Sequence, residues 1–219
     1  MTTVEADLDM PLSTAMRQGS LAQHSDAENA TFTSELMAGR INEAGYTDYL
    51  RLLRRVYAAL EQVGRDLADD PIAAELYDPA LDRLAAIESD IAHWSGGGSL
   101  DIDSPAAEAY AARVRAAASS PLKFIAHHYT RYLGDLSGGL AIGRIIDRTY
   151  GSTGQGVAFY DFETIAKPKD YKDGYRARLD ALPLDAAQRA EVVAEVQEAF
   201  RHNQALFDEL SASMDAYRR

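Results

Sequence analysis

The sequence predicts an all-α protein with a single domain. Apolar residues recur at helical spacing in nearly every long segment, as they do over residues 46–67. No segment alternates at period two for long enough to predict a strand, and no repeat or low-complexity linker divides the chain. The 219 residues, 47% of them hydrophobic, suffice for one packed core. We expect residues 1–9 to be a disordered N-terminal segment and residues 10–215 to form the domain.

Start and stop signals place the helices of the N-terminal half. Asp9-Met10-Pro11 predicts the start of a helix that runs to about Asn29, and a short helix over 32–38 ends at Gly39. Asn42 is a suitable cap for the helix over 46–67, which Asp70-Pro71 ends. A helix over 80–93 is closed by the glycine-rich loop 95–99.

The C-terminal half follows the same rules. Serine followed by proline opens a helix at 104–105 and another at 120–121. The second of these begins a periodic segment, 121–150, that we predict to be one helix. Residues 151–167 are rich in glycine and aromatic residues and indicate a loop, and 169–182 a short helix. Asp185 and Gln188 have the spacing of a capping box for a final helix that runs to about Asp215.

Composition and charge exclude several kinds of protein. The chain has no cysteine, which excludes disulfides, thiolate-held iron–sulfur clusters and thiolate-ligated haem. Its net charge of −12 argues against a nucleic-acid partner, because phosphate binding needs a basic face. No apolar run approaches the ~20 residues that span a bilayer, and the acidic N-terminus lacks a signal-peptide pattern. We therefore expect a cytoplasmic protein with no membrane partner.

Glycines mark the most informative stretch of the chain. Gly134, Gly138 and Gly139 lie within six residues of the predicted helix over 121–150, and Gly143 follows. Each glycine inside a helix costs about 1 kcal/mol relative to alanine. Glycine permits a bend and lets another body approach the main chain. The glycines therefore favour either a flat ligand lying against the backbone or close helix–helix packing, and both interpretations stay open at this point.

A family resemblance adds to this reading. The run His127-x-Tyr129-Thr130-Arg131-Tyr132-Leu133-Gly134-Asp135-Leu136-Ser137-Gly138-Gly139 closely resembles the signature of the heme oxygenase family. Residues 23–32, 158–162, 171–176 and 199–204 also match, in order and at compatible spacing, so that the resemblance covers about residues 10–212. It implies a single-domain helical bundle that holds haem between a proximal helix and a kinked, glycine-rich distal helix. In having no hydrophobic tail, the sequence is similar to the soluble bacterial members of the family.

The resemblance implies that His24 is the proximal ligand of the haem iron. A neutral imidazole is the usual fifth ligand where oxygen must bind at the sixth position. Glu28 lies one turn further on and would orient the ring, with a plain solvent-facing charge as the alternative. Without the matching flanks, His24 would more simply be a surface or capping histidine.

Asp135 is the residue to which the resemblance assigns proton delivery. Haem cleavage needs a proton supplied to an iron-bound peroxide without direct contact by a strong acid, and a carboxylate acting through ordered water meets that need. Thr130 and Arg131, with Tyr132, are the implied neighbours in this network. The same analogy makes Gly134 and Gly138 the distal wall that directs oxygen toward one porphyrin edge. On spacing alone Asp135 would be an ordinary exposed aspartate.

Cationic residues are implied to bind the two haem propionates. Lys172 and Arg176 are four residues apart and share a helix face, Arg17 lies seven residues before His24, and Tyr129 matches a position that reaches a propionate. The alternative for these residues is a solvated basic helix face. Other residues implied to line the pocket are Gly139, Phe200 and Asn203, where Phe200 could also be simple core. For Lys167 and Lys169 we favour docking of an acidic redox partner.

Taken together, these residues predict a heme oxygenase. The reaction would cleave haem b, both substrate and cofactor, with O2 and electrons to biliverdin (IXα by analogy), carbon monoxide and ferrous iron. The sequence has no flavin or nicotinamide motif, so the electrons would come from an external donor such as a ferredoxin or a flavoprotein reductase. We expect a monomer. The alternatives are a non-catalytic haem carrier, which would need His24 and the basic rim but not Asp135, and a helical interaction protein without haem.

Overall fold

The structure is helical throughout the part of the chain that it describes. A computed structural model describes residues 10–219, and the segment 1–9, for which we expect disorder, lies outside the described residues. Within residues 10–219 there is no strand, and the one extended pairing there is an isolated antiparallel bridge between Ile41 and Arg218. The predicted all-α class is confirmed.

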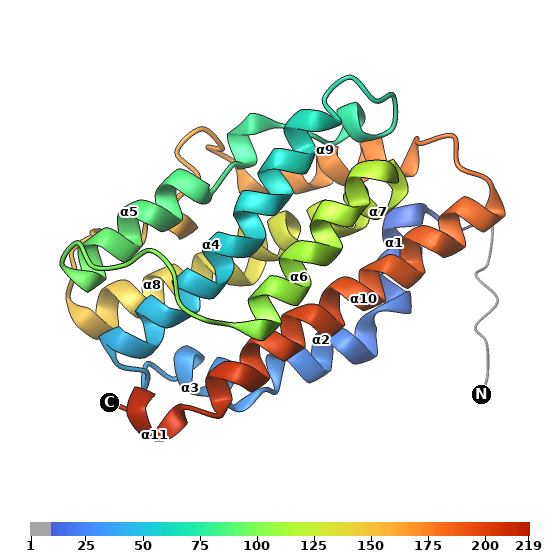
Figure 1. The fold of residues 1–219 in the computed structure, drawn as a ribbon. Coiled ribbons are helices and arrows are strands. Elements are labelled where there is room, and N and C mark those ends of the chain that lie inside the picture. Colours follow the sequence, from blue (N-terminus) through green and yellow to red (C-terminus); the bar gives the residue numbers. More distant parts are fainter. Residues whose placement is uncertain (1–9) are drawn as a thin grey trace.

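Figure 1 shows how the helices are arranged along the chain. The α-helices are α1 (Leu12–Gly19), α2 (Leu21–Glu28), α3 (Thr31–Met37), α4 (Glu43–Asp66), α5 (Leu84–Ser95), α6 (Pro105–Ala116), α7 (Pro121–His128), α8 (Leu140–Tyr150), α9 (Pro168–Asp180), α10 (Ala186–Ser211) and α11 (Met214–Tyr217). Short 3₁₀ turns occur at η1 (Ala73–Glu75), η2 (Pro79–Leu81), η3 (Ala117–Ser119) and η6 (Ala158–Tyr160). Two π-helical turns, η4 (Tyr129–Leu133) and η5 (Asp135–Gly139), join α7 to α8.

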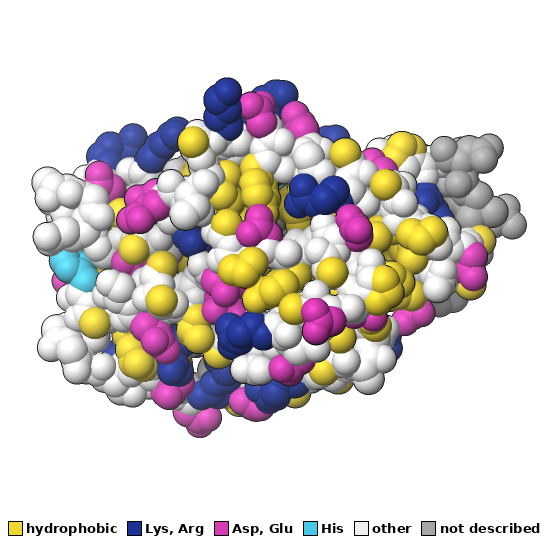
Figure 2. All heavy atoms as spheres, turned by 90° about the horizontal axis from the view of Figure 1, so that it is seen from above, with side chains coloured by type: hydrophobic (Ala, Val, Ile, Leu, Met, Phe, Trp, Pro, Cys, Tyr) yellow, Lys and Arg dark blue, Asp and Glu magenta, His cyan; other side chains and the backbone are white. Residues whose placement is uncertain are grey.

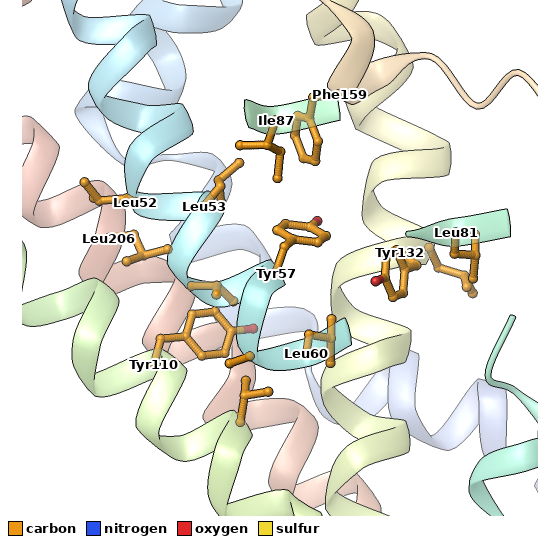
Figure 3. Packing of buried hydrophobic residues seen from close by; sticks show 14 of the residues in the cluster. Leu52, Leu53, Tyr57, Leu60, Leu81, Ile87, Tyr110, Tyr132, Phe159 and Leu206 are labelled. Atoms are coloured by element: carbon orange, nitrogen blue, oxygen red, sulfur yellow. The ribbon is translucent and has the colours of Figure 1, made fainter. Parts of the chain in front are cut away.

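Two long helices organise the bundle. α4 packs between α5 and α6, and α10 runs alongside α1, α2, α6 and α7 (Figure 1). The core between them contains phenols as well as aliphatic side chains, since Tyr57, Tyr110 and Tyr132 are fully buried (Figure 3). A buried tyrosine hydroxyl needs a hydrogen-bond partner, so these residues bring polar atoms into the centre of the bundle.

Capping signals in the sequence predicted two helix starts correctly. The Asn42 side chain accepts a hydrogen bond of 2.9 Å from the Gly45 amide at the start of α4. Asp185 and Gln188 form both bonds of the capping box at the start of α10. The final helix ends earlier than expected, at Ser211, and α11 follows it.

The predicted helix over 11–29 is wrong in one respect, because it divides at Ser20. Ser20 has φ −113° and ψ 10°, and its hydroxyl donates to the Met16 carbonyl at 2.8 Å. A serine that bonds back to its own helix offers the chain an alternative to the next helical turn. Arg17 and His24, seven residues apart, therefore do not lie on one continuous helix.

The segment 121–150 is helical without interruption, as predicted, but it is not uniform. Its middle consists of η4 and η5, the two π-helical turns. A π turn fits an extra residue into a helix and changes its direction, and such turns concentrate at functional sites. In the text that follows, η4 and η5 together are called the distal segment.

Candidate active site

Gly134 and Gly138 leave open space on one face of the distal segment. A Cβ atom built on either glycine has no heavy atom within 4 Å. The backbone at Gly134 is ordinary right-handed helix, with φ −63° and ψ −48°. These positions therefore use the missing side chain rather than the conformational freedom of glycine, and a flat ligand can approach the main chain there.

Gly139 and Gly143 meet a different neighbour. A Cβ on Gly139 would lie 3.1 Å from Cδ1 of Tyr160, and one on Gly143 only 2.7 Å from the Tyr160 Cβ. Close packing thus accounts for these two glycines, whereas open space accounts for Gly134 and Gly138. Gly139, which the resemblance placed among the haem-contacting residues, is buried beneath the Tyr160 ring.

Asp135 lies at the centre of a buried hydrogen-bond cluster. It is 5% exposed and accepts a hydrogen bond from the Tyr57 hydroxyl of α4. The guanidinium of Arg131 lies 3.6 Å from the carboxylate and donates to the Tyr57 oxygen at 3.1 Å. Arg131 also donates to the Asn203 side-chain oxygen of α10 at 2.6 Å. The alternative that Asp135 is an ordinary exposed charge is excluded by this burial.

The electrostatics of the cluster favour a carboxyl that can hold a proton. Burial raises the pKa of Asp135, and the positive charge of Arg131 and the bond from Tyr57 oppose that rise. Burial also raises the pKa of Tyr57 well above its usual value, so its hydroxyl stays protonated. The cluster therefore contains one group, Asp135, whose proton affinity lies closer to neutrality than that of an exposed aspartate.

Two residues implied as network neighbours have other partners. The Thr130 hydroxyl donates to the Ala126 carbonyl of its own helix at 2.8 Å. The Tyr132 ring is fully buried and packs edge-on against Tyr57, with ring centroids 5.7 Å apart. Both side chains support the helix rather than contact Asp135 through any hydrogen bond in the described structure.

His24 lies on a helix that has little protein around it. Ala27 is the single buried residue of α2, and the His24 side chain is 51% exposed. Its Nδ1 atom lies 3.4 Å from an oxygen of Glu28, one turn along the helix. A carboxylate at this distance can orient the imidazole, as Glu28 was expected to do.

One helix connects His24 with the distal segment. Phe200 of α10 packs edge-on against the His24 ring, with centroids 5.4 Å apart. Asn203, one turn later on α10, contacts Arg131. Residues three apart share a helix face, so the same side of α10 reaches both α2 and the Asp135 cluster. Figure 1 shows α10 alongside α2.

The four residues implied to bind propionates gather at one edge. The charges of Arg176 and Arg17 oppose the rise in the pKa of Tyr129 that burial causes. The helices that carry the two arginines, α1 and α9, pack against each other. Lys172 donates to the Ser137 hydroxyl of the distal segment at 2.8 Å, and Arg176 lies beside Asp173 at 3.0 Å. Burial and the Arg176 charge lower the pKa of Lys172. We call Arg17, Tyr129, Lys172 and Arg176 the basic rim.

The two lysines expected to dock a redox partner are already paired. Lys169 lies 2.9 Å from Asp173, and Lys167 lies 3.9 Å from Asp170. Figure 2 shows the same mixture on one face of the molecule, where Lys and Arg side chains lie among Asp and Glu side chains. Pairs this exposed contribute little fixed field, so these lysines form no concentrated positive patch.

Sequence reasoning missed three residues of the site. Tyr57 holds Asp135, Ser137 binds Lys172, and Tyr160 fills the space left by two glycines. A signal exists for Tyr57, since a tyrosine on the apolar face of a helix has a hydroxyl that must find a partner. Tyr160 comes from the segment predicted as loop, where the sequence has no periodicity to assign it a neighbour.

This geometry describes an all-α protein with open space over two glycines, a buried acid next to that space and an exposed imidazole. Comparison with known proteins identifies the group more closely. A sequence profile described as "Heme oxygenase" matches residues 10–209. Heme oxygenase 1 of Synechocystis is 35% identical over 94% of this chain and 88% of that protein. Heme oxygenase 1 of Homo sapiens is 35% identical over 91% of this chain and 71% of that protein.

Solved structures agree with the sequence comparison. Heme oxygenase-1 from Synechocystis in complex with heme superposes with a TM-score of 0.90 at 34% identity, covering 94% of this chain and 95% of that one. Heme oxygenase from Leptospira interrogans superposes with a TM-score of 0.88 at 30% identity, covering 91% and 100%. The chain belongs to the heme oxygenase family, whose members are oxidoreductases that degrade haem to biliverdin.

Proposed function

We propose that this chain cleaves haem b, as both substrate and cofactor, to biliverdin IXα, carbon monoxide and ferrous iron. The observation that carries the proposal is the pairing of open space over Gly134 and Gly138 with the buried acid at Asp135. A haem carrier would need the space and an imidazole, but it would have no use for a carboxyl whose proton affinity is raised beside that space.

The residues present fit a haem. A Cβ would fill the space over Gly134 and Gly138, so a macrocycle can lie against their backbone. The exposed imidazole of His24 supplies the nitrogen ligand that such iron takes, and the basic rim supplies cations for two carboxylates. When bound, the haem supplies the iron at which oxygen is reduced and the ring that is opened.

Each group of the chain then has a defined task. His24 holds the ligand on one side, with Glu28 fixing the ring by its Nδ1 contact of 3.4 Å. Asp135 holds a proton at a carboxyl oxygen, and the Tyr57 hydroxyl and the Arg131 guanidinium keep that carboxyl in one orientation. Water between Asp135 and the ligand would pass the proton, which keeps the acid at a distance.

The basic rim sets the orientation of the ligand within its plane. Lys172 and Arg176 come from α9, while Arg17 comes from α1, so the two propionates are held from two directions. A ligand fixed at that edge presents one meso carbon to the space over Gly134 and Gly138. By the family analogy, that carbon would be the one whose cleavage gives biliverdin IXα.

Partners and location complete the proposal. Every helix within residues 10–219 is too short or too polar to cross a lipid bilayer. We propose a cytoplasmic monomer that takes electrons from a ferredoxin or a flavoprotein reductase. Lys167 and Lys169 are each paired with an aspartate, so they do not mark where that donor docks. Experiment is needed to map the docking face.

Haemin titration followed by reduction under air tests the proposed function. We expect a Soret band that forms at one equivalent and then bleaches into a bilin absorption when a ferredoxin system is added. Carbon monoxide trapped by ferrous myoglobin and iron trapped by a ferrous chelator should appear in equal amounts. A stable Soret band would indicate a carrier, and no band at all would indicate a protein that does not bind haem.

A further inference from the structure

The helix that supplies two cations of the basic rim buries few side chains. Tyr175 and Leu179 are the buried residues of α9, a helix of 13 residues. The preceding loop, 151–167, contains the short turn η6 and no longer helix. Tyr171 and Arg178 bond to Asp78 and to the Glu75 carbonyl at the surface of α9, while Tyr175 is its one buried polar side chain. The position of Lys172 and Arg176 therefore depends in part on what Tyr175 contacts.

Tyr175 contacts His128 in two ways. The Tyr175 hydroxyl and His128 Nδ1 lie 2.9 Å apart, and the two rings are stacked with an interplanar angle of 5° and centroids 5.7 Å apart. Tyr175 is completely buried and His128 is 2% exposed. Water therefore does not compete for this hydrogen bond. The ring stacking already fixes the orientation of both side chains, so the bond requires no further loss of side-chain entropy.

The surroundings of His128 keep it uncharged. Phe124 and Tyr132 pack against the ring from its own helix, with centroids 5.3 and 4.6 Å away. Burial lowers the pKa of His128 to about 3, with Arg178 adding to that effect and Asp78 opposing it. The neutral imidazole, in the tautomer protonated at Nε2, accepts a hydrogen bond from the Tyr175 hydroxyl at Nδ1 over the whole physiological range of pH.

We propose that His128 and Tyr175 form a positioning pair that fixes α9 against the distal segment. The pair thereby sets the angle at which the propionate-bearing edge of the ligand sits in its plane. This inference rests on the proposed function, because it concerns which meso carbon is presented for cleavage.

The place of both residues in the chain supports the proposal. His128 ends α7 and is followed directly by Tyr129 of the basic rim, seven residues before Asp135. Tyr175 precedes Arg176 directly and lies three residues after Lys172 on α9. A small rotation of α9 about its axis would shift both cations relative to the distal segment, and the His128 bond opposes that rotation.

Tyr175→Phe removes the hydroxyl while keeping the ring stack. Tyr171→Phe is the matched control, since it removes a hydroxyl bond of 2.7 Å to Asp78 from the same helix one turn earlier. The measurements are the ratio of biliverdin isomers and, without turnover, the hyperfine-shifted methyl signals in the proton NMR spectrum of the cyanide-bound haemin complex. Thermal unfolding of the ligand-free variants records stability separately.

We expect Tyr175→Phe to change the ratio of minor to major isomer by about tenfold, as for the loss of one buried hydrogen bond, and to add a second set of methyl signals. Tyr171→Phe should leave both readouts as in the wild type. If Tyr175→Phe lowers only the unfolding temperature, with one isomer and one set of signals retained, the pair is merely structural and the proposal is overturned.

Substitutions of the partner residue keep the proposal testable if Tyr175→Phe folds poorly. His128→Gln offers a side-chain oxygen to the Tyr175 hydroxyl and should retain the wild-type isomer ratio, whereas His128→Leu fills the space without an acceptor and should behave as Tyr175→Phe. Equal ratios in both variants would overturn the proposal. A wild-type protein that forms no Soret band would instead overturn the proposed function.

Discussion

The two sides of the candidate site are built differently. On the proximal side α2 buries one residue, Ala27, and His24 is half exposed with Glu28 as its polar neighbour. On the distal side Asp135 and Arg131 are buried, and their bonds reach Tyr57 of α4 and Asn203 of α10. The protein therefore preorganises the groups proposed to hold protons and leaves the proposed iron ligand on a helix with little packing.

The comparison also separates two uses of glycine within one helix. Gly134 and Gly138 face open space, whereas Gly139 and Gly143 face the Tyr160 ring. The first pair makes room for a ligand and the second makes room for the protein. Stability and binding should consequently respond in opposite directions when the two pairs are changed.

The largest expected effect belongs to the proximal side. His24→Ala should abolish bilin formation, because the chain then lacks the imidazole that holds the iron. The helical circular dichroism and the unfolding temperature should stay near the wild-type values, since the side chain is 51% exposed and contributes little packing. Undiminished bilin formation by this variant would remove His24 from the role of ligand.

The distal side should respond by losing rate rather than binding. Asp135→Ala should still give a Soret band with haemin but should lower the rate of bilin formation by about a hundredfold or more, the contribution typical of a positioned acid. Asp135→Asn is the control that can still accept the Tyr57 bond but has no proton to deliver. Normal turnover by either variant would assign proton delivery to another group.

The contacts of Glu195, next to the distal segment, give the stability of this side of the site a pH dependence. Glu195 of α10 bonds to His127 Nε2 at 2.9 Å and to Arg113 Nε at 2.7 Å. Burial raises the pKa of Glu195, but the bonds from His127 and Arg113 outweigh burial and lower the pKa to about 2 from its ordinary value of 4.5.

A carboxyl whose pKa is lower in the folded than in the unfolded protein stabilises the fold at pH values above its unfolded pKa. This stabilisation is lost as the pH falls through the folded pKa. Glu195→Gln should therefore cost up to about 3 kcal/mol at pH 7, and the difference from wild type should shrink between about pH 4.5 and pH 2. Urea unfolding from pH 7 to pH 3 measures it. A difference independent of pH would show that the ionised carboxylate is not what stabilises this contact.

The smallest expected effect distinguishes most clearly between the two pairs of glycines. Gly138→Ala places a methyl group in open space, so the ligand-free protein should gain about 1 kcal/mol of helix stability while haemin binds more weakly. Gly143→Ala drives its Cβ against Tyr160 at 2.7 Å and should lose about 1–3 kcal/mol. Chemical unfolding and haemin titration measure the two effects. Tight, unaltered haemin binding by Gly138→Ala would mean that no ligand lies there.

Local signals made much of the fold predictable. Asn42 and Asp185 are caps that act within three residues, and periodicity alone placed the helix over 121–150. The division at Ser20 was not predictable in this way, because serine is tolerated inside a helix. Whether its hydroxyl bond to the Met16 carbonyl replaces the next helical turn is decided in the folded chain. Helix boundaries depend on such local competition.

The site was predictable in its residue types but not in its pairings. The resemblance named Asp135, Arg131 and Asn203, yet it did not place Tyr57 against Asp135, because the two are 78 residues apart in the sequence. The same holds for His128 and Tyr175, which are 47 residues apart. Periodicity shows which face of a helix is buried, whereas the identity of the partner depends on how distant helices pack.

A helix that buries one side chain is stabilised mainly by what it binds. When ligand coordinates through His24, the local opening free energy of residues 20–29 should rise with occupancy, because the ligand binds the closed form alone. The rate of proteolytic cleavage within residues 20–29 should therefore fall as the ligand-bound fraction of the protein rises. On the proposed function, we expect this short helix to be the part of the site that loosens when product leaves, while the buried cluster around Asp135 keeps its arrangement for the next turnover.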